Sequence, residues 1–321
     1  MESASRIYVA GHSGLAGSAL ARALRAAGFR NLLLRSHAEL ELRDARAVAD
    51  FFARERPEYV VVAAAKVGGI LANNRFPADF IRDNLAIELN VVCEAARAGV
   101  KRLLLLGSSC IYPRDCPQPM KEEHLLTGPL EATNRAYAVA KIAGIELCWS
   151  YNRQHGTRFL AAMPTNLFGP GDHYDLETSH VLPALIRKVH EAKARGERTV
   201  TAWGSGRPRR EFLYSDDMAE ACVFLMRLPE AAFARLAAPG VVPLINVGAG
   251  KDLSIAELAA LVGEALGYEG GFIYDASKPD GTPRKLLDTS RLAALGWQAR
   301  IGLREGIALA YRDFLAQKSE T

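Results

Sequence analysis

Short apolar runs alternate with amphipathic stretches through the first half of the chain. Five apolar runs have the length and composition of buried strands: residues 7–10, 32–34, 59–63, 103–106 and 159–163. Stretches with apolar residues at helical spacing lie between them: 18–27, 45–55, 78–98 and 134–154. This alternation predicts an α/β fold of Rossmann type, in which helices cover both faces of a doubly wound parallel sheet. Ligands of such sheets bind at the carboxyl ends of the strands.

The pattern changes after Met163. Residues 164–171 are rich in turn formers, and we expect the charged stretch 187–211 to be less regular. The apolar run Leu244–Val247 is expected to return to the sheet. We therefore predict two domains that are interleaved in sequence. They are a Rossmann domain at 1–169, with later segments near 213–250, and a smaller C-terminal domain, mainly for substrate binding, at 170–321.

Composition narrows the class of protein. With 321 residues, of which 49% are hydrophobic and 24% charged, the chain has the values of a globular protein with ample core. A net charge of +4 does not indicate a nucleic-acid partner, and the longest apolar run, 59–65, is far shorter than the roughly 20 residues that cross a membrane. The five cysteines lack CxxC spacing, so we expect neither disulfides nor a metal site. Because no signal-peptide pattern opens the sequence, we expect a cytoplasmic protein.

A glycine-rich turn follows the first predicted strand and opens a helix: Gly11, His12, Ser13, Gly14, Leu15, Ala16 and Gly17. A dinucleotide fingerprint requires this context. Gly11 permits the tight turn, Gly14 lets the backbone approach a pyrophosphate at the helix N-terminus, and Gly17 allows close packing of the helix. The turn therefore predicts a dinucleotide cofactor.

The end of the second predicted strand distinguishes NADP from NAD. An NAD enzyme usually places a carboxylate there for the ribose hydroxyl, whereas this chain has Arg35, Ser36 and His37. A guanidinium suits a 2′-phosphate, which a carboxylate would repel. We predict NADP as the cofactor; the alternative is that Arg35 is an ordinary solvated charge.

Ser108, Tyr137 and Lys141 combine into a candidate catalytic group. Tyr137 and Lys141 are four residues apart in a predicted helix and so lie on one face, while Ser108 follows a predicted strand. A neighbouring ammonium favours the phenolate, so we expect Lys141 to lower the pKa of Tyr137 toward neutrality. Ser108 could then hold a carbonyl oxygen near the phenol, which suits hydride chemistry. Taken singly, each residue could instead belong to a helix surface or a strand end.

With these residues in place, the chain resembles the extended short-chain dehydrogenase/reductases over nearly its whole length. Among them it is similar to the GDP-4-keto-6-deoxymannose epimerase/reductases, which form GDP-L-fucose. Five segments carry this closer resemblance: 63–70, 107–113, 163–170, 203–212 and 275–285.

The resemblance implies a bifunctional 3,5-epimerase and NADPH-dependent 4-reductase that acts on GDP-4-keto-6-deoxymannose as a homodimer paired through 78–98 and 134–154. Cys110 and His180 match the acid/base pair for epimerisation, a role that their chemistry suits. The resemblance also implies cofactor contacts at Leu106, Gly107, Ser108, Ser109, Lys141, Pro164, Thr165, Asn166, Leu167 and His180. It implies substrate contacts at Lys188, Trp203, Arg210, Asp280 and Lys285.

Ser13 and Lys188 depart from the family pattern, because some relatives carry arginine at these places. Lys188 keeps the charge but loses the fork geometry of arginine. Two classes of rival function remain: another sugar-nucleotide enzyme of the same superfamily, or a non-catalytic protein. A sugar-nucleotide 4,6-dehydratase typically has an Asp-Glu pair where Ser109 and Cys110 stand, and a plain 4-epimerase usually retains NAD. A non-catalytic NADP-binding protein commonly loses the tyrosine or the lysine.

Overall fold

The computed structural model describes residues 1–278 and 280–319. Pro279, which belongs to the segment 275–285, and residues 320–321, the end of the predicted second domain, lie outside the described residues. The strands are β1 (Ile7–Ala10), β2 (Leu32–Leu33), β3 (Tyr59–Val62), β4 (Arg102–Leu106), β5 (Phe159–Pro164), β6 (Asn166–Phe168), β7 (Thr199–Trp203), β8 (Arg209–Tyr214), β9 (Leu244–Val247), β10 (Asp252–Ser254), β11 (Gly271–Asp275) and β12 (Arg284–Lys285). The helices are α1 (Leu15–Ala26), α2 (Ala45–Glu55), α3 (Ile70–Arg75), α4 (Pro77–Arg97), α5 (Arg135–His155), α6 (Val181–Arg195), α7 (Ser215–Arg227), α8 (Glu230–Leu236), α9 (Ile255–Leu266), α10 (Ser290–Ala294) and α11 (Leu303–Ser319), with short 3₁₀ turns η1 (Ser109–Ile111), η2 (Glu122–His124) and η3 (Ala132–Asn134).

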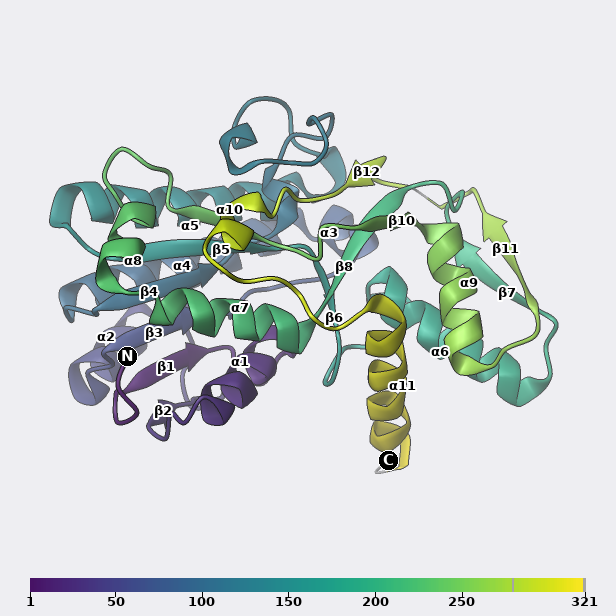
Figure 1. Ribbon diagram of the computed structural model, residues 1–321, viewed down its shortest axis with the longest axis horizontal. Helices are drawn as coiled ribbons and strands as arrows, with labels where there is room; N and C mark the ends of the chain where they lie inside the picture. The colour runs from purple at the N-terminus through teal and green to yellow at the C-terminus, as the bar shows by residue number, and fades with distance from the viewer. Residues whose placement is uncertain (279, 320–321) are drawn as a thin grey trace.

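A six-stranded parallel sheet forms the larger part of the molecule, in the order β2-β1-β3-β4-β5-β9 (Figure 1). The strand order reverses between β1 and β3, and the carboxyl ends of these two strands border the crevice where such sheets bind ligands. The Rossmann-type parallel sheet predicted from the alternation is therefore confirmed. Leu244–Val247 joins the sheet as β9, as predicted.

Side chains of the strands alternate between two cores. Ile7 and Val9 of β1 pack with α1 and α7, whereas Tyr8 and Ala10 pack with α2, α4 and α5. Every residue of β1, β3, β4 and β5 is buried, because helices cover both faces. Short apolar runs in the sequence thus correspond to strands without a solvent face.

A smaller lobe carries a separate core built from α6, α9, α11 and the strands β7 and β8 (Figure 1). Strand β8 pairs with β6, β10 and β12, and β11 pairs with β7. The chain passes to the smaller lobe after β5, returns to the larger part of the molecule at α7 and β9, and enters the smaller lobe again at β10. This path agrees with interleaved segments, while the domain boundary at 169/170 stays a prediction.

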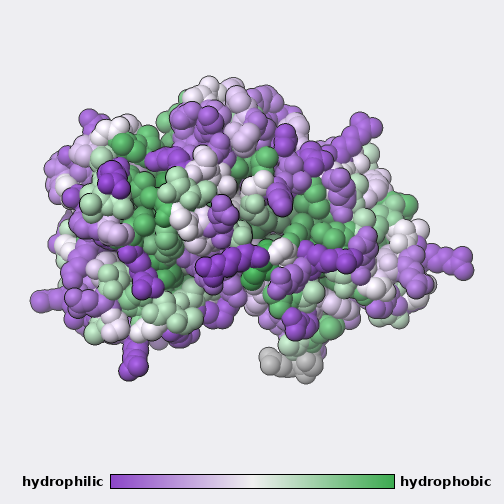
Figure 2. All heavy atoms as spheres, in the orientation of Figure 1, coloured by the Kyte–Doolittle hydropathy of each residue, from purple (hydrophilic) through white to green (hydrophobic). Residues whose placement is uncertain are grey.

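The expectation of irregular structure at 187–211 is wrong. Most of this stretch belongs to α6, β7 and β8. The helix α6 buries an apolar stripe against the lobe's core at Leu182, Leu185, Ile186, Val189 and Ala192, and its charged residues lie between and after these positions in sequence. Hydrophilic residues are likewise scattered over the face in Figure 2, with hydrophobic ones in the recesses between them. Within the described chain, no helix is long and apolar enough to span a bilayer.

Candidate active site

The glycine turn is shaped by close backbone packing. Gly11 has a φ of 81°, and a Cβ there would lie 2.6 Å from the backbone nitrogen of Ala64. A Cβ on Gly17 would collide with the carbonyl oxygen of Gly11. Gly14 is the N-cap of α1 and has no side chain to bond the free N–H groups of the first turn. The turn therefore leaves a backbone cradle that fits the diphosphate of a dinucleotide.

One cavity of about 1050 Å³ lies at the carboxyl ends of the strands and extends to the smaller lobe. It is lined by every predicted site residue except His12, whose Nδ1 is buried without a hydrogen-bond partner in the described structure. The lining residues that the sequence predicted are Gly11, Ser13, Gly14, Leu15, Ala16, Gly17, Arg35, Leu106, Gly107, Ser108, Ser109, Cys110, Tyr137, Lys141, Pro164, Thr165, Asn166, Leu167, His180, Lys188, Trp203, Arg210, Asp280 and Lys285.

Arg35 follows β2 in the sequence and lines the cavity. Its guanidinium donates to the carbonyl oxygen of Leu34 at 2.8 Å and forms an ion pair with Glu55 at 2.9 Å. The ring of Phe51 lies 5.8 Å from the guanidinium carbon. These contacts hold Arg35 on the cavity wall, where its remaining donors can receive an anionic group. Arg43, which the sequence analysis did not single out, also lines the cavity and is paired with Glu41 and Asp83.

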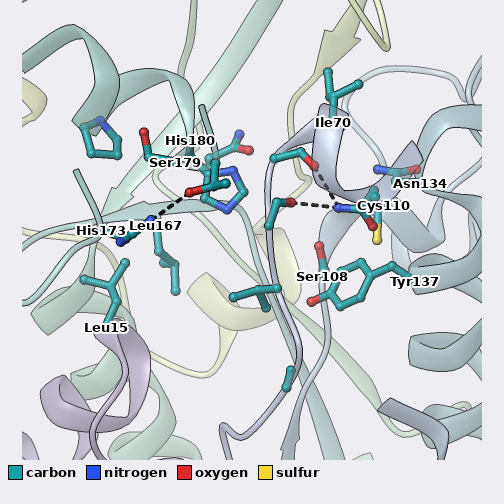
Figure 3. A pocket seen from close by; sticks show the side chains of 18 of the residues that line it. Leu15, Ile70, Ser108, Cys110, Asn134, Tyr137, Leu167, His173, Ser179 and His180 are labelled. Atoms are coloured by element: carbon teal, nitrogen blue, oxygen red, sulfur yellow. Dashed lines mark hydrogen bonds between the residues drawn. The ribbon is translucent and has the colours of Figure 1, made fainter. Parts of the chain in front are cut away.

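Tyr137 and Ser108 meet on the wall formed by β4 and α5 (Figure 3). The Tyr137 ring packs edge-on against Phe80, with the ring centroids 6.3 Å apart. Burial raises the pKa of Tyr137 to about 12, although Lys141 and a hydrogen bond with Ser108 both act to lower it. The expected shift toward neutrality is therefore wrong for this structure, and Tyr137 is held in its protonated form.

Lys141 has its own buried partner, Glu88 of α4. Lys141 is fully buried and donates to Glu88 Oε1 at 2.9 Å and to the carbonyl oxygen of Leu106 at 3.0 Å. Burial acts to lower the pKa of Lys141, but the attraction of Glu88 and Tyr137 raises it. Burial raises the pKa of Glu88. The ammonium is thus compensated by a carboxylate 53 positions away in sequence, a pairing that no local motif reveals.

Cys110 and His180 lie on opposite sides of the pocket (Figure 3). Cys110 sits in the turn η1 behind Ser108, and burial raises the pKa of its thiol, against an opposing effect of Lys285. His180 is the N-cap of α6 and faces the cavity. Its enclosure by the cavity walls, with Lys285 and His173 as positive neighbours, lowers its pKa. The ligand-free site therefore holds a thiol facing a neutral imidazole.

Cations gather in the part of the cavity that belongs to the smaller lobe. Burial lowers the pKa of Arg210 to about 10 and also lowers the pKa of Lys285. Lys188 and Lys278 both lie over the ring of Trp203, with ammonium-to-centroid distances of 4.9 and 5.2 Å. Lys278 was missed in the sequence, because only the fold brings the segment 275–278 beside β7. This wall is suited to a diphosphate.

Asp280 and the basic loop have anchoring contacts. Both carboxylate oxygens of Asp280 accept hydrogen bonds from Ser205, from its backbone N–H and its hydroxyl, each at 2.7 Å. Arg209 is paired with Asp252 and Glu257 on the outer side of β8, while the neighbouring Arg210 lines the cavity. The alternation of side chains along β8 thus separates a structural arginine from a site arginine.

Several polar atoms on the cavity wall have no partner. Among the described residues, three cavity-lining side chains have a buried oxygen with neither a hydrogen bond nor an ion pair: Asn73, Asn134 and Ser179. Unpaired buried oxygens favour a ligand that brings hydroxyl or amide donors. The sequence analysis singled out none of these three, because they come from three separate segments, α3, η3 and the loop before α6, that only tertiary packing brings to the cavity.

Comparison with known proteins agrees with this geometry. Residues 7–236 match the NAD dependent epimerase/dehydratase family. The chain is 52% identical to the GDP-L-fucose synthase of Escherichia coli K12, over 98% of this chain and 97% of that protein. It is also similar to the structure of a GDP-L-fucose synthetase from Naegleria fowleri bound to NADP, with 28% identity, a TM-score of 0.86, and 99% and 96% of the two chains covered.

A third relative has a different sugar in its name. It is the structure of a GDP-mannoheptose C4 reductase from Campylobacter jejuni with NADP bound, with 35% identity, a TM-score of 0.86, and 98% and 99% of the two chains covered. The matches extend over both lobes, and the cavity lies between elements of both. The chain therefore belongs to the NAD dependent epimerase/dehydratase family, in the group that contains the GDP-L-fucose synthases.

Proposed function

We propose that the protein is a bifunctional 3,5-epimerase and NADPH-dependent 4-reductase that converts GDP-4-keto-6-deoxymannose to GDP-L-fucose. The observation that supports it best is the shared cavity. Ser108, Tyr137 and Lys141 line it together with Cys110 and His180, so reduction and epimerisation can act on one bound sugar. About half of the residues are shared with the Escherichia coli enzyme of this name.

In the reduction half, Tyr137 is the proposed proton donor to the oxygen at C4. A pKa of about 12 keeps the phenol protonated at neutral pH, and the Ser108 hydroxyl can hold the substrate oxygen beside it. NADPH, when bound, supplies the hydride for C4. The cradle at Gly11, Gly14 and Gly17 and the donors of Arg35 would hold its diphosphate and its 2′-phosphate.

In the epimerisation half, the 4-keto group acidifies the protons at C3 and C5. Inversion requires removal of a proton from one face of the sugar and its return to the other. A neutral imidazole at His180 and a protonated thiol at Cys110, on opposite sides of the pocket, are complementary groups for these two tasks (Figure 3).

For binding of the nucleotide, we propose that Arg210, Lys188 and Lys285 hold the diphosphate and that Trp203 covers the ligand. The two ammonium groups over the Trp203 ring add charge at the same place. Lys188 donates to the carbonyl oxygen of Thr201 at 2.9 Å, which fixes a side chain that lacks the arginine fork. Asp280 takes part by anchoring the turn at Ser205.

For assembly, we propose a homodimer through α4 and α5. These helices pack on each other and expose Leu89 and Val139. Sedimentation at several concentrations tests this assignment. Five free cysteines fit a reducing compartment, so we propose the cytoplasm.

The decisive experiment is incubation with GDP-4-keto-6-deoxymannose and NADPH in deuterated water. We expect GDP-L-fucose with deuterium at C3 and C5, and exchange should not require hydride transfer. Cys110→Ser and His180→Asn should suppress exchange, whereas Tyr137→Phe should retain it and block reduction. A reduced sugar without inversion would remove the epimerase half of the proposal. Absence of NADPH consumption would remove the reductase half and leave the rival epimerase and the non-catalytic NADP-binding protein.

A further inference from the structure

Glu88 is a buried carboxylate to which neither proposed half-reaction gives a role. It lies on α4 and is fully buried. Its Oε1 accepts from Lys141, while Oε2 has no hydrogen-bond partner in the described structure. A Cβ on Gly144 of α5 would collide with Oε2, so this glycine makes the space that the carboxylate fills.

We propose that Glu88 is a positioning residue for the reduction: it holds Lys141 beside Tyr137 and compensates the ammonium charge, so that Tyr137 stays a protonated acid. This inference rests on the proposed function. In this proposal, a residue outside the catalytic group determines whether Tyr137 is protonated and donates a proton or is ionised and removes one.

The geometry supports both parts of the assignment. Glu88 and the carbonyl oxygen of Leu106 take two of the three ammonium hydrogens of Lys141, which fixes its position. The ammonium nitrogen lies 5.8 Å from the centroid of the Tyr137 ring. At such a distance in a buried site, an uncompensated ammonium would strongly favour the phenolate. Because desolvation offsets the attraction in a buried ion pair, the pair of Glu88 and Lys141 contributes little to stability, and a role in positioning accounts for it better.

The charged and titratable neighbours are few. Tyr137 faces Lys141, Cys110 and Glu88 in addition to the Ser108 hydroxyl. Lys141 faces Glu88, Tyr137 and Cys110, and Cys148 of α5 faces Glu88. Cys110 in turn faces Lys285. Burial has the largest effect on the pKa of Tyr137 and raises it; Lys141 lowers this pKa, whereas Cys110 and then Glu88 raise it. Reduction consumes a proton at the substrate oxygen, so the protonated phenol is the form that it needs.

The test uses Glu88→Gln, which keeps the shape and the acceptor for Lys141 but removes the charge. Tyrosinate absorbance of the ligand-free enzyme is measured against pH, with the same variant carrying Tyr137→Phe subtracted. We expect Tyr137 to titrate roughly one to three pH units lower than in the unmutated protein. The kcat of reduction should then fall with rising pH over that range, with little change in the KM for NADPH.

Glu94→Gln is the matched control, because Glu94 lies on the same helix and pairs with Arg97. Its titration and pH profile should equal those of the unmutated protein. Glu88→Asp keeps the charge, so it should restore the high titration of Tyr137 even where the shorter side chain slows turnover. Should Glu88→Gln not fold, Glu88→Gln with Lys141→Met removes both charges, and Tyr137 should then titrate no lower than in the unmutated protein.

An unchanged or higher titration of Tyr137 in folded Glu88→Gln would overturn the proposal, as would a lowered titration in the doubly neutral variant. The titration needs no substrate. Failure of the proposed function would instead appear as absent turnover in the unmutated protein, so the two failures are distinguishable.

Discussion

At the scale of single residues, the surroundings of Tyr137 decide the direction of its proton transfer. The ring lies among Phe80, Ser108 and Lys141, and burial outweighs the ammonium. The four-residue spacing of Tyr137 and Lys141 predicted correctly that the two side chains would meet on one wall. It could not predict the pKa, because the burial that raises it depends on how other elements pack around the ring.

Tyr137→Phe should lower the kcat of reduction by roughly 10²- to 10⁴-fold, since it removes the proton donor. NADPH binding, followed by the fluorescence of the reduced cofactor, should stay near normal. In the unmutated protein the pKa of about 12 implies that reduction does not lose rate through deprotonation of Tyr137 below about pH 10. Turnover of the Phe variant at the unmutated rate would contradict the assignment.

Arg35 belongs to the same scale, since one guanidinium replaces the carboxylate expected in an NAD enzyme. Arg35→Ala should cost about 1.5–3 kcal/mol in NADPH binding, or roughly ten- to a hundredfold, and leave NADH binding unchanged. Isothermal titration with both cofactors measures the difference. Arg54→Ala is the control, because Arg54 also pairs with Glu55 but does not line the cavity. Equal losses in both variants would mean that Glu55 is the important partner.

At the scale of elements, α1 depends on a close approach to the turn that precedes it. The sequence predicted this helix from residue 18, whereas it begins at Leu15, because the helical turn starts directly after the extended Gly14. The same reasoning predicted 45–55 correctly, where Asp44 accepts from the N–H groups of Arg46 and Ala47 and marks the start. The spacing of apolar residues therefore predicted which segments are strands and which are helices, while the residues at which the helices begin depended on backbone conformation.

Gly17→Ala should disturb both this packing and the cofactor cradle. The added Cβ meets the carbonyl oxygen of Gly11, which is backbone and cannot rotate away. We expect a loss of about 1–3 kcal/mol in the free energy of unfolding and weaker NADPH binding. Denaturant titration and cofactor titration measure the two effects. Gly240→Ala, at a glycine with open space, should change neither; retention of NADPH affinity in Gly17→Ala would show that the turn tolerates a wider spacing.

At the scale of the whole molecule, buried polar contacts join segments that the sequence separates widely. Asn246 of β9 donates to the carbonyl oxygens of Met120 and Asp288 and accepts from Tyr112. Glu211 accepts from the backbone N–H groups of Gly250 and Leu287. The sequence predicted interleaved segments, and the family resemblance supplied Cys110, His180 and the cations. It could not predict such cross-chain partners, because hydrogen bonding between distant segments leaves no spacing pattern.

The C-terminal helix α11 contacts the loop that leads to His180, and this junction contains a carboxyl group with an unusual pKa. Burial, together with Asp313 of α11, raises the pKa of Asp172 to about 7, against a hydrogen bond from the N–H of His173. Asp313 also accepts from the N–H of Gly171 at 2.9 Å. A carboxyl group whose pKa is higher in the folded than in the unfolded chain favours folding while it is protonated. Its contribution is complete below about pH 4 and is lost as the pH rises to about 7.

Asp172→Asn imitates the protonated form, so its melting temperature should match the unmutated protein near pH 4 and exceed it at pH 8. Asp175, three residues later, has a pKa shift of the opposite sign, because hydrogen bonds from Thr178 and Glu177 lower its pKa. It stabilises above the unfolded pKa, and that stabilisation is lost in acid. Asp175→Asn should therefore melt below the unmutated protein at pH 8 and approach it at low pH. Thermal unfolding without cofactor from about pH 2 to pH 8 compares the two, and parallel shifts in both variants would show that burial at the α11 junction does not govern Asp172.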